Sequence, residues 1–149
     1  MFILRHFCLA AHGYKITCQY TLWDFFKELD QLGKDDSKGI KRAMNMGRMI
    51  ADLLYSEALH LSVLKTVEWT SPSPGQTYFL VTLFQTLLSK PFKKKGSEAL
   101  FNRIFKSLAD MSQLEGVSDG IVLFLSTQFG KADSEIRSRI KVVKSILNP

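Results

Sequence analysis

Apolar residues recur along this chain at three- and four-residue steps, and this periodicity constrains its fold more than any other feature. The predicted helices cover about residues 14–32, 39–59, 62–67, 76–89, 98–111, 119–129 and 133–147. In the predicted helices 14–32, 39–59, 76–89, 98–111 and 133–147, the apolar positions form one stripe along the helix, which must be buried against a neighbour. Ser97 and Ser118 are candidate N-caps for two of these helices. The sequence therefore predicts an all-α fold.

Composition and turn signals agree with that prediction. The 149 residues include only 4 Pro and 9 Gly, while hydrophobic residues make up 46% and include 11 Phe and 2 Trp. That is enough apolar material for a sizeable core. The clearest break, Ser-Pro-Ser-Pro-Gly at 71–75, is short and predicts a turn between helices. Short connections favour antiparallel helical hairpins, and we expect them to stack in a HEAT-like array.

The first eleven residues are apolar but interrupted by Arg5 and His6. This makes a poor signal peptide and is far too short to span a membrane, so we expect no membrane partner. We interpret the segment as the end of a helix whose beginning is missing, which predicts an N-terminally truncated fragment. Cys8 and Cys18 are the only cysteines, and we expect free thiols of an intracellular protein.

Positive charge is concentrated in the second half of the chain. Residues 1–75 hold 9 Lys/Arg and 8 Asp/Glu, whereas residues 76–149 hold 11 and 6. A basic half suits an acidic partner such as RNA, because lysine and arginine neutralise phosphates. The candidate RNA-binding residues are Lys90, Lys93, Lys94, Lys95, Arg137, Arg139, Lys141 and Lys144. The alternative is an ordinary solvated basic surface, with Phe92 in the core rather than stacked on a base.

No residue pattern predicts catalysis. The three histidines, at 6, 12 and 60, lie in no nucleophile elbow or catalytic-loop pattern, and no glycine-rich phosphate loop is present. The series His6-x-Cys8-x₃-His12-x₅-Cys18 lacks the tightly paired ligands of a structural zinc site. We therefore expect no enzyme, no catalytic residue, no metal, no cofactor and no small-molecule substrate.

Aromatic residues gather on the first long helix, at Tyr20, Trp23 and Phe26. Packing within the core is one interpretation of this group. The other is a protein interface, where an exposed Trp is often an energetic anchor. Under that interpretation Trp23 and the adjacent Asp24 are the interface candidates.

One set of segments is more specific than these patterns. Residues 20–29, Tyr-Thr-Leu-Trp-Asp-Phe-Phe-Lys-Glu-Leu, resemble a motif of the nucleolar MIF4G-domain-containing proteins, and Phe7-Cys8 matches the Phe-Cys that precedes it. Three later segments are similar to that family as well: Leu-Ser-Val-Leu-Lys-Thr-Val at 61–67, Ser-Asp-Gly-Ile-Val-Leu-Phe-Leu at 118–125, and the basic stretch 139–144. The matches follow the family's order and cover nearly the whole chain.

The resemblance implies that residues 1–70 are part of an MI (MA-3) helical domain and that residues 71–149 are a C-terminal helical extension packed on it. It also implies a non-catalytic adaptor in the nucleolus that acts in small-subunit ribosome biogenesis and 18S rRNA processing. The expected partners are a DEAD-box RNA helicase of the initiation-factor-4A type, the pre-ribosomal particle and rRNA.

Two alternatives stay open. One is a basic helical RNA-binding module, and the other is a translation regulator that binds the cytoplasmic initiation helicase. The family's middle domain and the first MI helices have no counterpart here. No helicase-contacting residue can therefore be transferred from the family to this sequence.

Overall fold

The computed structural model describes residues 12–32, 36–90 and 96–149, and for residues 12–15 and 18 it describes the backbone alone. In these ranges every regular element is a helix, which confirms the all-α prediction. The elements in chain order are α2 (His12–Leu29), α3 (Ser37–Tyr55), η1 (Leu61–Thr66), α4 (Pro74–Ser89), α5 (Ser97–Ala109), η2 (Ser112–Leu114), α6 (Glu115–Gln128) and α7 (Ser134–Leu147). Both η elements are 3₁₀ helices.

Local side-chain caps begin several of these helices. Asp36, Ser73 and Asp133 each accept a hydrogen bond from the backbone N–H three residues later, which satisfies a donor that has no intrahelical partner. The prediction for Ser97 was wrong, because Gly96 at φ 90° precedes the helix and Ser97 is its first residue. Ser118 is also not a cap, since α6 begins at Glu115 and buries Ser118.

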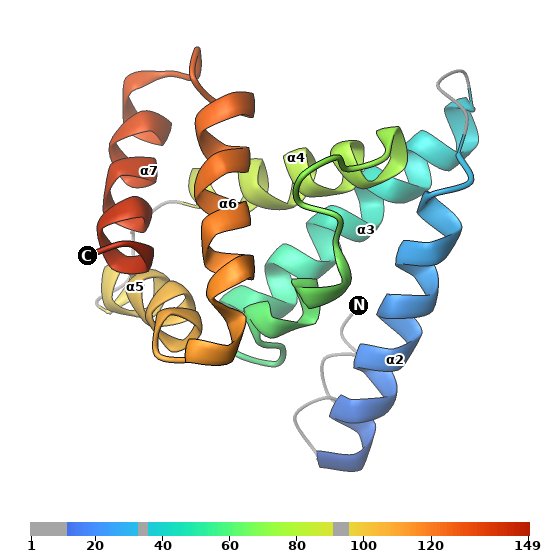
Figure 1. The fold of residues 1–149 in the computed structure, drawn as a ribbon, viewed down its shortest axis with the longest axis horizontal. Helices are drawn as coiled ribbons and strands as arrows, with labels where there is room; N and C mark the ends of the chain where they lie inside the picture. Colours follow the sequence, from blue (N-terminus) through green and yellow to red (C-terminus); the bar gives the residue numbers. More distant parts are fainter. Residues whose placement is uncertain (1–11, 33–35, 91–95) are drawn as a thin grey trace.

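The first three long helices form one packed group (Figure 1). Helices α2 and α3 run in opposite directions (Figure 1) and meet at their connecting ends, where Glu28 of α2 forms an ion pair with Arg42 of α3 (3.2 Å) and a Cβ added at Gly39 would lie against Leu32. The pair α2 and α4 is also antiparallel where the helices touch: the backbone of Leu29 meets Gly75 at the start of α4, and Phe26, one turn earlier in α2, lies 5.0 Å from Phe79, one turn later in α4, between ring centres. This part of the predicted hairpin arrangement is confirmed.

The pair α3 and α4 runs in the same direction, which the hairpin rule did not anticipate. Gly47 in the middle of α3 lies against the middle of α4, and Asp52 near its end pairs with Lys90 just after α4 ends. The connection through η1 carries the chain back toward the N-terminal end of α3, so the consecutive long helices α3 and α4 are parallel. Glycine at 47 permits their close contact, because a Cβ there would lie 2.7 Å from the carbonyl oxygen of Phe79.

The last three helices form a second group, in which α6 and α7 lie side by side and α5 crosses at one end (Figure 1). A continuous hydrophobic core joins the two groups. Aromatic rings connect the two groups. The ring centre of Phe124 in α6 lies 6.0 Å from that of Phe84 in α4 and 6.2 Å from that of Trp69. Packing is therefore continuous across the expected boundary at residue 70, and the division into 1–70 and 71–149 stays a prediction.

Candidate functional site

The outer side of α7 carries two of the predicted RNA-binding residues. Arg137 and Lys141 are exposed, and together with Ser134 and Ser138 they line a shallow hollow of about 260 Å³. Lys144, one turn further along, is half-buried. Arg137 and Lys141 thus present positive charge on one exposed surface of the last helix.

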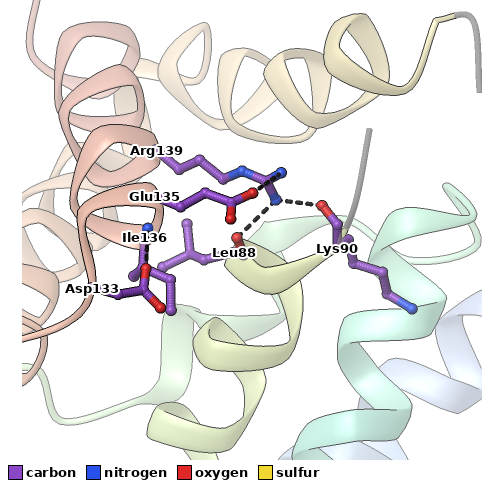
Figure 2. Close-up of polar contacts among 6 residues, drawn as sticks. All are labelled: Leu88, Lys90, Asp133, Glu135, Ile136 and Arg139. Carbon is purple, nitrogen blue, oxygen red and sulfur yellow. Dashed lines mark hydrogen bonds and ion pairs between the residues drawn. The ribbon is translucent and has the colours of Figure 1, made fainter. Parts of the chain in front are cut away.

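Arg139 occupies a different environment and corrects its assignment as an RNA contact. Its side chain is 9% exposed. Figure 2 shows it extending from α7 to the end of α4, where Nη1 donates hydrogen bonds to the carbonyl oxygens of Leu88 (2.8 Å) and Lys90. Nη2 forms an ion pair with Glu135 at 3.3 Å. A guanidinium held in this way inside the fold is not available to a phosphate.

The position of Arg139 has a clear physical role. The last carbonyl groups of a helix have no intrahelical partner and carry partial negative charge. Here the two acceptors, Leu88 and Lys90, lie at the end of α4, and no glycine cap follows. A buried cation from α7 satisfies them, and so joins the two helical groups.

Lys90, another predicted RNA contact, is also engaged within the fold. Its Nζ lies 2.6 Å from the carboxylate of Asp52 and 5.7 Å from the centre of the Tyr55 ring. The remaining lysines of this group, Lys93, Lys94 and Lys95, lie outside the described residues. Of the eight candidates, the structure therefore brings Arg137 and Lys141 together on the surface and assigns Arg139 and Lys90 internal contacts.

The predicted interface pair on α2 separates into an inner and an outer residue. Trp23 is half-buried, its Nε1 donates to the carbonyl oxygen of Val63 (2.8 Å), and Lys65 Nζ lies 4.7 Å from its ring centre. Asp24 is exposed, and Lys27 Nζ lies 4.0 Å from its carboxylate. Trp23 therefore fixes η1 against α2, and Asp24 faces solvent.

Tyr20, which the sequence grouped with Trp23 and Phe26 but did not nominate for the interface, is 60% exposed and meets the Trp23 ring edge-on, with 5.2 Å between the ring centres. It lies one turn before Trp23, so helical spacing was the signal available. Tyr20, Trp23 and Lys65 form an aromatic and cationic patch, which we call the α2 patch.

A hollow of about 450 Å³ lies where α3, η1 and α5 meet. His60 lies on its wall, and its Nδ1 accepts a hydrogen bond from the N–H of Ser62 at the start of η1. Burial lowers the pKa of His60 below its ordinary value, and a hydrogen bond with the backbone of Ser107 opposes this shift only in part. Glu57 and Arg103 on the same wall are paired with each other at 3.1 Å. The Glu57–Arg103 pair joins α5 to the connection between α3 and η1.

Among the described residues, no three His, Cys, Asp or Glu side chains gather as metal ligands would. In the His/Cys series that we did not expect to bind zinc, His6 and Cys8 lie outside the described residues. For His12 and Cys18 only the backbone is described, in α2. No helix in the described ranges has both the length and the apolar composition needed to cross a bilayer.

Comparisons with known proteins found three relatives. Nucleolar MIF4G domain-containing protein 1 from Homo sapiens is 26% identical over 84% of the chain, and that from Mus musculus is 28% identical over 83%. Suppressor of glycerol defect protein 1 from Schizosaccharomyces pombe is 31% identical over 54%.

The chain spans 13% of the length of each mammalian relative and 11% of the yeast relative. No protein-family model and no solved structure matches it. The matches to the mammalian proteins extend over most of the chain and agree with the resemblance seen in its motifs. The chain is therefore a distant relative of the nucleolar MIF4G domain-containing proteins.

Proposed function

We propose that this chain is a non-catalytic adaptor that acts in the nucleolus during small-subunit ribosome biogenesis and 18S rRNA processing, by binding a DEAD-box RNA helicase of the initiation-factor-4A type. The observation that carries the proposal is the similarity over 84% of the chain to a protein named for its nucleolar location and MIF4G domain. In this proposal residues 1–70 are the partial MI domain and residues 71–149 its packed extension.

The architecture suits an adaptor. A helical array held by one continuous core offers a preformed surface, so a partner can bind without ordering the chain first. Such a protein changes a helicase only by binding one of its conformations more tightly than another. The exposed edge of the α2 patch, with Asp24 one turn from Tyr20, is the surface we nominate.

The test is ATP turnover by the cognate helicase with and without the full chain, together with direct binding measured by calorimetry. We expect binding and a change in turnover, both lost in the double variant Tyr20→Ala/Asp24→Lys. The control is Lys131→Ala, an exposed change in the loop between α6 and α7. Absence of binding by the unmodified chain would refute the helicase partner, and equal binding by the double variant would refute the surface.

A second function, RNA binding, is favoured by the exposed pair Arg137 and Lys141 on α7. Binding through phosphates must weaken as salt rises, since counterions are released. We expect Arg137→Glu/Lys141→Glu to reduce affinity for single-stranded rRNA and to flatten its salt dependence. Affinity that persists at high salt would count against this function.

A further inference from the structure

The face of α3 that points away from α4 is uncovered by any described helix. Ala43, Gly47 and Ile50 of α3 are buried, whereas Lys38, Lys41, Asn45, Arg48 and Asp52 are exposed. The exposed residues follow one another at three- and four-residue steps, so they lie in one row along the helix. We call this row and the residues beside it the α3 face.

The cations of the α3 face are largely uncompensated. Lys38 and Lys41 form no ion pair with any residue in the described part of the chain. Arg48 donates to the neutral amide oxygen of Asn45 at 2.9 Å, which leaves its full charge. The carboxylate of this row, Asp52, is already paired with Lys90. The face therefore presents three free positive charges within about three helical turns.

An apolar strip accompanies those charges. Met46 and Met49 are half-buried and, together with the cations of the row, line a shallow, open hollow of about 630 Å³ on the surface of α3. Methionine side chains are flexible and polarisable, so they adapt to the shape of another apolar side chain. Among the described residues that line the hollow, none has an aromatic ring on which a nucleotide base could stack.

From these features we propose that the α3 face is a docking site for an acidic amphipathic helix. Leucine-like side chains of the partner would enter the hollow beside Met46 and Met49, while its Asp and Glu residues meet Lys38, Lys41 and Arg48. Charge complementarity selects an acidic partner, and the methionine strip selects a peptide over a nucleic acid. The proposal is independent of the helicase and RNA functions, which use other surfaces of the molecule.

The test is fluorescence anisotropy of the full 149-residue chain with three labelled probes. The first is a helical peptide of about 18 residues with leucines along one face and glutamates on its flanks. The second has the same composition with the leucines dispersed around the helix. The third is single-stranded oligouridine, which carries negative charge without an apolar face.

We expect the amphipathic peptide to bind best, with an affinity that falls as salt is added. Lys38→Glu/Lys41→Glu should weaken it by about tenfold or more, since both charges are reversed at the interface. Lys106→Glu/Lys131→Glu, exposed lysines on other elements, changes net charge equally and should alter affinity by less than about twofold. Met49→Gln should weaken the amphipathic peptide and leave oligouridine unaffected.

Circular dichroism of each variant verifies that the helices are retained. Equal binding of the dispersed peptide would overturn the amphipathic partner, and tighter binding of oligouridine at the same residues would reassign the face to RNA. A parent chain that binds no peptide, or equal losses in the two double variants, would overturn the site.

Discussion

Replacing Arg139 by methionine is the most direct test of how the two helical groups are joined. Methionine fills a similar volume but cannot donate to the carbonyl oxygens of Leu88 and Lys90, so the end of α4 loses its cap. Since Arg139 is 8% exposed, water cannot readily replace the lost donor.

The expected cost follows from the contacts. A hydrogen bond from a charged donor contributes about 1.5–3 kcal/mol, and a cation at a helix C-terminus adds about 0.3–1 kcal/mol. Removing the charge also removes its desolvation penalty, which offsets part of the loss. The exposed Glu135 partner (77% of its side chain) contributes at most about 1 kcal/mol. We expect a net loss of about 3 kcal/mol, or roughly 10 °C in Tm.

Urea unfolding followed by far-ultraviolet circular dichroism measures this loss. The matched control is Arg137→Met, an exposed arginine two residues earlier on the same helix, which should change the free energy of unfolding by less than about 0.5 kcal/mol. If Arg139→Met cost no more than its control, the interpretation of Arg139 as an internal cap for α4 would be refuted.

Three further predictions concern packing, pH and hydrogen bonding. Gly47→Ala should lower the free energy of unfolding by about 2 kcal/mol or more, although alanine has the better helix propensity, because the new methyl group would lie 2.7 Å from the α4 backbone. Gly116→Ala has open space around the new methyl group and should raise the free energy of unfolding by about 0.5 kcal/mol. Thermal melts of the two variants measure both effects. Burial lowers the pKa of His60 below 6.5, so the folded state disfavours its protonation, and the free energy of unfolding should fall as pH drops through and below 6.5. His60→Asn keeps an acceptor for the Ser62 N–H but cannot take up this proton. Urea titrations at several pH values should therefore show a smaller pH dependence of stability in this variant. Trp23→Phe should cost about 1 kcal/mol by losing its hydrogen bond to the η1 backbone, and an unchanged Tm would argue against this contact.

Much of the secondary structure was readable in advance because helix formation leaves a local, periodic record. The stripe through Leu22, Phe25, Phe26, Leu29 and Leu32 predicted a buried side. The first four are at most 5% exposed, and Leu32 is half-buried. Helix ends were less predictable. Ser118 has the right side chain for a cap, but the chain enters α6 three residues earlier and buries it. Capping depends on where the backbone enters the helix, and side-chain chemistry alone does not determine that.

The interaction surfaces depended more on the fold than on the residues. Counting charge by halves directed attention to the C-terminal part and missed the α3 face. In that count Lys38, Lys41 and Arg48 are offset by acidic residues of other elements, such as Asp24 of α2. Charges separate into surfaces only when the helices are placed.

By itself, the sequence determined the all-α class, the approximate helices and the distant relationship to the nucleolar MIF4G domain-containing proteins, since each rests on local periodicity or on short ordered motifs. Only the tertiary structure decided that α3 and α4 run parallel and that Arg139 is internal while Arg137 faces solvent. Both arginines occupy ordinary positions of one basic helix. What distinguishes them is the end of α4, about fifty residues away in the chain. Its last carbonyl groups have no partner within the helix, and they lie beside Arg139 and not beside Arg137.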